Sequence, residues 1–198
     1  FSVDLMLDAS ASRLDSQQII AMQGYMIAES LKKCGIPAQV YSFLSIRGYT
    51  VMRRFFGYDD KEKEKKLLDY CAAGWNRDGL AFRGAGYLMN SSPAKNKILI
   101  VLTDASPNDD RKVPADLSEG RVINREYSGV TGIEDTAGEV RALRKAGVKV
   151  IAIINGRSPD TRAAMKIYQK DFVMIKSPDE LARAAGDLIQ KQIMQFYT

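Results

Sequence analysis

The feature that most constrains the fold is a pair of short, mostly apolar runs, each followed directly by an aspartate. Residues 3–7 run into Asp8, and residues 97–103 run into Asp104. Runs of this kind, without strict alternation of apolar and polar residues, are typical of parallel strands that are covered on both faces. In an open parallel sheet, ligands gather at the carboxyl ends of the strands, where the strand order reverses. We therefore expect Asp8 and Asp104 to lie in one crevice.

The residues after the first run add two hydroxyl groups to this crevice. Asp8, Ser10 and Ser12 occupy alternate positions, and the period of two along an extended backbone directs their side chains to the same side. Hard oxygen ligands suit a small divalent cation, Mg²⁺ or Mn²⁺. The alternative is that each aspartate only caps a helix or a turn. Because a carboxylate at the end of a buried strand is costly unless something pairs with it, the pattern favours the metal site.

Predicted strands and helices alternate along the chain, which indicates an α/β fold. We predict a doubly wound, mostly parallel sheet of six strands, with helices on both faces and an antiparallel edge strand at 49–56. The strands are expected at 3–7, 38–44, 49–56, 97–103, 148–154 and 172–175. Helices are expected at 14–33 and 79–88, from a capping box at 136–139 to Gly147, from 158–160 onwards, and from a second capping box at 177–180. We expect residues 105–132 to form one long irregular loop, and such loops are usually functional or disordered.

Composition narrows the classes of protein. The chain of 198 residues is long enough for one domain with a substantial core, and no apolar run approaches the roughly 20 residues of a membrane span. His is absent, and Cys34 and Cys71 lack metal-site spacing, as expected of free thiols in a reducing cytoplasm. The net charge is +5, but no arginine-rich stripe with interleaved aromatic residues indicates nucleic-acid binding. We expect one cytoplasmic domain over residues 1–198, cut from the C-terminal part of a longer protein because Phe1 already lies in a strand.

These motifs resemble a known family. Asp8-x-Ser10-x-Ser12 together with the segment 102–104 resembles the metal-ion-dependent adhesion site of a von Willebrand factor type A domain, and the resemblance extends over the whole chain. A narrower resemblance, to the A domains of nitric oxide reductase activation proteins (NorD type) and cobaltochelatase CobT subunits, rests on the segments 76–83, 102–109 and 132–136. It implies a non-catalytic, Mg²⁺-dependent protein-binding module that works with a separate MoxR-type AAA+ ATPase on a target metalloenzyme.

The resemblance also implies roles for particular residues. In the family, two serine hydroxyls and a threonine of another loop ligate the metal, two aspartates act largely through water, and one position stays open for a partner's carboxylate. Here Asp78 falls where the threonine is usual, with Asn76 as the other candidate. The alternative is that Asp78 only caps a helix that begins at Gly79. The expected metal ligands are Asp8, Ser10, Ser12, Asp78 and Asp104.

The expected partner-binding rim of the site lies in the loops around these ligands. Asp135 either orients the long loop or favours the dipole of the helix that begins near it. Tyr127 either contacts the partner or packs the loop against the domain. The rim residues are Asn76, Asp109, Tyr127 and Asp135.

Two other classes of function use parts of the same pattern. A Mg²⁺-dependent phosphoryl-transfer enzyme needs an aspartate nucleophile with a second acid nearby and a phosphate-binding cation. Here Ser10 replaces the second acid, no lysine ends a later strand, and no P-loop is present. An extracellular adhesion domain is the other class, and the cysteine usage and the NorD-like segments argue against it.

Overall fold

The computed structural model describes residues 1–60, 64–120, 122–155 and 161–175, and residues 180, 181, 186, 187, 190 and 194 of the C-terminal segment. The strands are β1 Ser2–Asp8, β2 Ala38–Ile46, β3 Tyr49–Phe56, β4 Lys97–Thr103, β5 Asp109–Val113, β6 Arg125–Tyr127, β7 Val148–Ile154 and β8 Phe172–Met174. The α-helices are α1 Gln17–Lys33, α2 Asp78–Leu88, α3 Gly129–Lys145 and α4 Thr161–Tyr168, and short 3₁₀ helices cover Ala11–Ser16, Glu64–Asp69, Met89–Ser91 and Leu117–Glu119.

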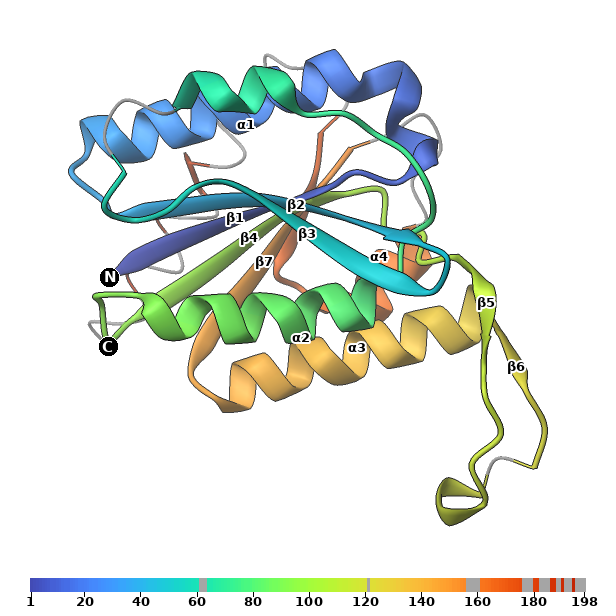
Figure 1. The fold of residues 1–198 in the computed structure, drawn as a ribbon. Coiled ribbons are helices and arrows are strands. Elements are labelled where there is room, and N and C mark those ends of the chain that lie inside the picture. The colour runs from blue at the N-terminus through green and yellow to red at the C-terminus, as the bar shows by residue number, and fades with distance from the viewer. Residues whose placement is uncertain are drawn as a thin grey trace.

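Six of the described strands form one sheet in the order β3-β2-β1-β4-β7-β8. β2 and β3 pair antiparallel, and the other neighbouring pairs are parallel. Figure 1 shows α1 on one face of the sheet and α2 and α3 on the other. The predicted doubly wound α/β fold with an antiparallel edge strand is therefore confirmed.

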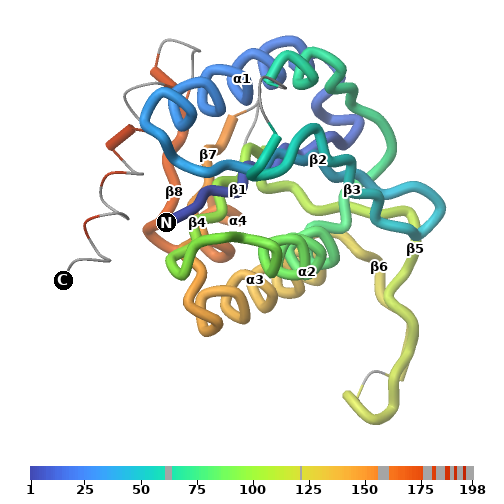
Figure 2. The backbone as a smooth tube through the Cα atoms, turned by 60° about the vertical axis from the view of Figure 1, so that its left-hand side comes forward, coloured from blue at the N-terminus to red at the C-terminus, as the bar shows by residue number. Residues whose placement is uncertain are grey.

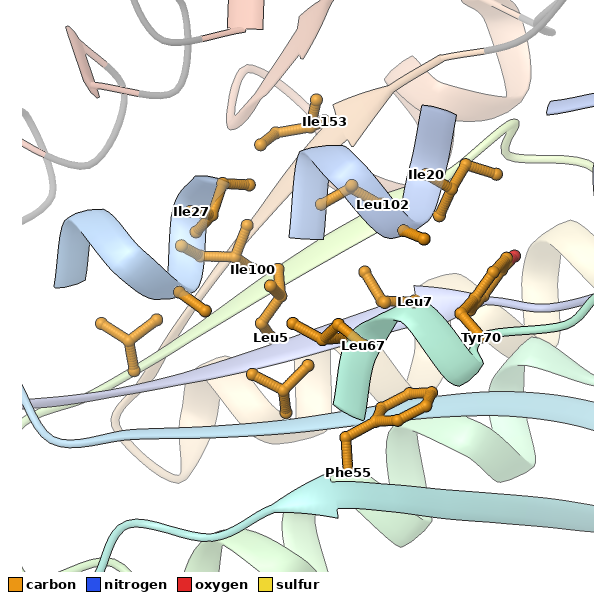
Figure 3. Close-up of a cluster of buried hydrophobic side chains, with 14 of the residues drawn as sticks. Leu5, Leu7, Ile20, Ile27, Phe55, Leu67, Tyr70, Ile100, Leu102 and Ile153 are labelled. Carbon is orange, nitrogen blue, oxygen red and sulfur yellow. The ribbon is translucent and has the colours of Figure 1, made fainter. Parts of the chain in front are cut away.

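Alternate side chains of the central strands build a core on each face of the sheet. Toward α1, Leu5 and Leu7 of β1 and Ile100 and Leu102 of β4 pack with Ile20 of the helix (Figure 3). The intervening side chains of the same strands belong to a second core with α2, α3 and α4. Because both faces are covered, the central strands carry apolar residues at successive positions, which explains the unbroken run in β4.

Helix α3 begins earlier than the sequence predicted. It starts at Gly129, with Ser128 as the N-cap, and not at Thr136. The Thr136 hydroxyl donates a hydrogen bond to the backbone oxygen of Gly132 at 2.7 Å, as serine and threonine often do inside helices. A Cβ at Gly132 would lie 2.9 Å from the backbone oxygen of Pro107, so the first turns of α3 pack tightly on the loop after β4. The predicted capping box at 136–139 was wrong because this tertiary contact favours helix upstream of it.

The segment 105–132, predicted to be irregular, contains an antiparallel hairpin. β5 pairs with β6, and Figures 1 and 2 show the hairpin projecting away from the sheet and its helices. Its residues are mostly charged and exposed, so no apolar periodicity revealed the strands in the sequence. The prediction of an irregular loop was therefore wrong at this point.

Other element boundaries differ by a few residues. The predicted helix at 14–33 is divided into the 3₁₀ helix Ala11–Ser16 and α1. The helix starts predicted at 158–160 and 177–180 fall on residues outside the described part of the chain, except residue 180, which is helical. In the described part of the chain, no helix has both the length and the apolar character needed to cross a membrane.

Candidate metal centre

The centre of the sheet brings the two strand-end aspartates together. β1 and β4 are parallel neighbours with Leu7 opposite Leu102, while β2 lies on the other side of β1. The strand order therefore reverses between β1 and β4, which is where α/β sheets bind ligands. Asp8 ends β1 and Asp104 directly follows β4, so both carboxylates lie at this reversal point.

Asp8 is fully buried and hydrogen-bonded on both oxygens. Its Oδ1 accepts from the backbone N–H of Ser10 at 2.9 Å, and its Oδ2 accepts from the hydroxyl of Thr103 at 3.1 Å. Burial, with a further contribution from the nearby charge of Asp104, raises the pKa of Asp8 to about 6. The negative charge at this position is therefore costly unless a cation compensates it.

The two serine hydroxyls form a chain of hydrogen bonds to the second aspartate. The hydroxyl oxygens of Ser10 and Ser12 are 3.1 Å apart, and the Ser12 hydroxyl donates to Oδ2 of Asp104 at 2.8 Å. The backbone N–H of Ser106 donates to the other oxygen, Oδ1, at 3.2 Å. The loop after β1 and the loop after β4 are thus joined by hydrogen bonds between side-chain oxygens.

Asp78 supplies a third buried carboxylate. Its Oδ1 accepts from Nδ2 of Asn76 at 2.9 Å, and its Oδ2 has no hydrogen-bond partner among the described residues. Burial and the charges of Asp8 and Asp104 raise the pKa of Asp78 well above its usual value. Asp78 is the first residue of α2, and Arg77 occupies the N-cap position. The alternative that Asp78 serves as the N-cap of a helix beginning at Gly79 does not describe this structure.

These groups are chemically suited to a hard divalent cation. Three mutually repelling carboxylates, from Asp8, Asp78 and Asp104, lie beside the hydroxyls of Ser10 and Ser12, and one buried carboxylate oxygen lacks a partner. A cation would relieve the repulsion and accept the free oxygen. Among the described residues, however, His, Cys, Asp and Glu side chains alone do not form a group of three or more that could hold a metal ion. A metal here would therefore need the hydroxyls, and water, among its ligands.

Two of the predicted rim residues, Asn76 before α2 and Asp109 at the start of β5, are buried at the base of the hairpin. The backbones of Asn76 and Asn108 exchange hydrogen bonds of 2.8 and 3.0 Å. Oδ2 of Asp109 accepts from Nε of Arg77 at 2.8 Å, in an ion pair that is almost inaccessible on the carboxylate side. Arg77 also donates to the backbone oxygen of Arg111. Asn76 and Asp109 thus fix the base of the hairpin beside the candidate metal ligands.

Tyr127 packs the hairpin onto the domain. Its ring is buried, and the Arg77 guanidinium lies 4.6 Å from the ring centroid. The Tyr127 hydroxyl donates to Oδ2 of Asp135 at 2.7 Å and accepts from the backbone N–H of Gly79 at 3.1 Å. Asp135, which lies inside α3, therefore positions Tyr127, and the side chain of Tyr127 offers little surface to a partner. Whether either residue affects partner binding stays a prediction.

Two of the NorD-like segments meet in space. A Cβ added at Gly79, in the segment 76–83, would lie only 1.9 Å from Oδ2 of Asp135, in the segment 132–136. The absence of a side chain at Gly79 therefore allows Asp135 to approach the start of α2. The contact between these segments gives a physical reason for their occurring together in one sequence.

A cleft opens beside the hydroxyls. It has a volume of about 360 Å³, and its lining residues are Ser10, Ala11, Ser12, Gly74, Trp75, Asn76, Ser106 and Asn108. Trp75 is 42% exposed, so an indole ring is available at its edge. A volume of this size can hold a side chain from another molecule beside the hydroxyls.

Sequence reasoning missed three residues of this centre. Thr103 donates to Asp8, as described above. The other two are Arg13, which lies next to Asp104, and Asn155, which binds Arg13. Oδ2 of Asp104 is 3.5 Å from Nη1 of Arg13, which also donates to the backbone oxygen of Asn155 at 2.7 Å. Asn155 directly follows β7. The position at the end of a predicted strand, which pointed to Asp8, therefore pointed to Asn155 as well. Arg13 has no such signal, because nothing in the sequence places this charge inside.

The chain was compared with known proteins. No protein-family model matches it. It is 26% identical over 169 residues to protein NorD of Stutzerimonas stutzeri, a match that covers 83% of this chain and 25% of NorD. It is 28% identical over 127 residues to an uncharacterized protein of Pseudomonas aeruginosa, covering 62% of this chain and 18% of that protein. The chain thus spans a quarter or less of the length of these relatives.

Solved structures with the same fold are more distant in sequence. The manganese-loaded TRAP protein of Plasmodium vivax has a TM-score of 0.64 at 16% identity, with 97% of this chain and 73% of that chain covered. The vWF domain of the pilus tip protein Mfa5 of Porphyromonas gingivalis has a TM-score of 0.64 at 12% identity, with 98% and 95% covered. The pilus adhesin SpaC of Lactobacillus rhamnosus GG has a TM-score of 0.68 at 15% identity, with 96% and 30% covered.

At these identities the solved structures establish the fold alone, and the NorD match agrees with the resemblance found in the sequence. The chain has the fold of von Willebrand factor type A domains, and its sequence resembles that of NorD.

Proposed function

We propose that this chain is a metal-dependent protein-binding module of a NorD-like protein. The observation that carries the proposal is the cluster of three buried carboxylates and two hydroxyls that adjoins the cleft at the strand-order reversal. Ser10 and Ser12 would hold Mg²⁺ or Mn²⁺ directly, and Asp8, Asp78 and Asp104 would supply negative charge directly or through water. The bound ion would supply a positive charge for a carboxylate of the partner.

The hairpin β5–β6 offers a second contact to the same partner. Its base is fixed beside the cleft by Arg77, while three large apolar side chains are exposed in its distal part, Leu117 at 79%, Val122 at 75% and Ile123 at 70%. Exposed apolar side chains on a projecting element offer a surface to a partner protein. The proposed interface therefore combines the metal ion with the apolar end of the hairpin.

The proposed partners follow from the resemblance to NorD. They are a MoxR-type AAA+ ATPase, encoded separately, and a metalloenzyme that the two proteins activate or load with metal. The module itself would be cytoplasmic and non-catalytic. The TRAP, Mfa5 and SpaC similarities support the fold, and at 12–16% identity they do not extend an adhesive role to this chain.

The proposal is tested by capture of the ATPase on the immobilised domain in Mg²⁺ and in EDTA. The double variant Ser10→Ala/Ser12→Ala should lose capture in Mg²⁺ to the level seen in EDTA. Ser30→Ala is the matched control, because its hydroxyl bonds only to a backbone oxygen of α1 on the exposed surface. Capture that persists in EDTA and in the double variant would place the interface elsewhere on the domain.

The hairpin contact is tested separately with the triple variant Leu117→Ser/Val122→Ser/Ile123→Ser. These side chains are exposed, so the domain should fold normally while capture weakens.

A phosphatase assay on the wild-type domain addresses the enzymatic alternative. Turnover that disappears in Asp8→Asn would support phosphoryl transfer instead of binding.

A further inference from the structure

The guanidinium of Arg13 is buried beside the candidate metal centre. The side chain is 2% exposed, and Nη1 lies 3.5 Å from Oδ2 of Asp104. A guanidinium stays charged at any physiological pH. Arg13 therefore places a permanent positive charge next to the three carboxylates of the centre.

This charge is held in place by the end of β7 and not by the metal centre. Nη1 donates to the backbone oxygen of Asn155 at 2.7 Å, and Nη2 donates to Oδ1 of the same residue. Asn155 is fixed in turn, because its backbone N–H donates to the oxygen of Thr103 at 3.0 Å and its Nδ2 donates to Oε1 of Gln23 at 2.5 Å. The guanidinium is thus anchored by bonds that do not involve Asp104.

Four charges belong to the candidate ligands and their ion pair, namely the carboxylates of Asp8, Asp78 and Asp104 and the guanidinium of Arg13, while Asp135 adds a smaller contribution at Asp78. A divalent cation brings the sum of the four charges to zero, whereas without Arg13 the loaded site would stay negative and repel an incoming carboxylate. We propose that Arg13 is the fixed counter-charge for the third carboxylate, Asp78, and that it allows the metal-loaded site to accept a carboxylate ligand. This inference rests on the proposed metal-dependent binding function.

The proposal predicts opposite shifts in two affinities. Arg13→Gln removes a charge that repels the cation and attracts the carboxylate, so the metal should bind about tenfold more tightly and the carboxylate about tenfold more weakly. Asp78→Asn should weaken metal binding and strengthen carboxylate binding by similar factors. Damage to the fold would weaken both affinities together, so the opposite signs separate a charge effect from a structural one.

In the first titration, Mn²⁺ is added to the 198-residue chain and its binding is monitored by electron paramagnetic resonance. In the second, acetate is added to the Mn²⁺-loaded protein and its binding is monitored by water-proton relaxation. Arg13→Lys keeps the charge but not the paired bonds to Asn155, so it should behave like wild type. The double variant Arg13→Gln/Asp78→Asn should return both affinities close to wild type. If Arg13→Gln does not fold, the double variant Arg13→Gln/Asp78→Asn is compared with Asp78→Asn, because the two proteins differ only in the charge of Arg13 and should show the same two opposite shifts.

Unchanged affinities, or two affinities that shift in the same direction, would overturn the role of Arg13. So would an Arg13→Lys protein that behaves like Arg13→Gln. A wild-type chain that binds no Mn²⁺ would instead contradict the proposed function on which the inference rests. The two failures are therefore distinguishable in one set of titrations.

Discussion

At the scale of single residues, Asp8 sets the response of the metal centre to pH. Burial and the charge of Asp104 raise its pKa from 3.8 to about 6. Because the folded pKa exceeds the unfolded one, the stabilising contribution of this carboxyl group is complete below about pH 4 and is lost as the pH rises through about 6. A bound cation favours the ionised form and so counteracts this loss.

Affinity for Mg²⁺ should therefore fall as the pH is lowered from 7 through about 6, because protons compete with the metal for Asp8. Isothermal titration at a series of pH values between about 5 and 8 and constant ionic strength measures the effect. An affinity that does not change with pH over this range would show that Asp8 does not contribute to the metal site.

Replacement of Asp8 by asparagine separates folding from metal binding. In EDTA at pH 7.5, Asp8→Asn should be more stable than wild type, because the buried charge is gone. Its free energy of unfolding should be higher by on the order of 2 kcal/mol. The amide oxygen can still accept from the N–H of Ser10, and the amide nitrogen can donate to Thr103. Urea denaturation measures this stability, and calorimetry should show no Mg²⁺ binding.

Asp59→Asn is the control for that experiment, since Asp59 is exposed and remote from the centre. It should change neither stability nor metal affinity. Equal Mg²⁺ affinity in wild type and Asp8→Asn would mean that the metal binds elsewhere.

At the scale of elements, the centre depends on how α2 meets α3. The first turn of α2 carries Asp78, and α3 carries Asp135, which accepts a hydrogen bond from Tyr127. The two helices approach closely at Gly79, where a Cβ would lie 2.6 Å from Cγ of Asp135. The position of the Asp78 carboxylate is therefore coupled to the anchoring of the hairpin.

Gly79→Ala should destabilise the domain by roughly 1–3 kcal/mol, because the added methyl group displaces the Asp135 carboxylate and breaks its bond to Tyr127. Thermal and urea unfolding measure the change. The matched control is Gly138→Ala in α3, where the nearest atom would be 3.9 Å from the added Cβ. That substitution should leave stability unchanged or raise it by about 0.5–1 kcal/mol, through helix propensity. Equal effects of the two substitutions would contradict the close approach at Gly79.

At the scale of the whole molecule, the metal-free domain carries repulsion at the centre of its sheet, so its stability should depend on the cation. At a free Mg²⁺ concentration of 100 times the dissociation constant, the gain should be about 2.7 kcal/mol. The melting temperature should rise accordingly in Mg²⁺ over EDTA, and Ser10→Ala/Ser12→Ala should show a much smaller rise. A rise of equal size in that variant would indicate nonspecific ion effects.

The sequence predicted the large features of this molecule. Unbroken apolar runs indicated central parallel strands, and the six-stranded, mostly parallel sheet with an antiparallel edge strand is confirmed. The strand-end aspartates Asp8 and Asp104 were expected to be neighbours, and β1 and β4 do pair directly. These predictions succeed because burial on both faces and the polarity of parallel strands leave a local pattern in the chain.

Other features were decided only by tertiary structure. α3 begins at Gly129 because its first turns pack on Pro107, although the local sequence favours a start at Thr136. The hairpin has no apolar periodicity and is held by contacts of Arg77 and Tyr127 with distant residues. The burial of Arg13 depends on Asn155, 142 positions away along the chain. The sequence by itself determined which residues form the sheet and end its strands, because those signals are local, whereas the charge balance of the site arises from contacts between segments far apart in the chain.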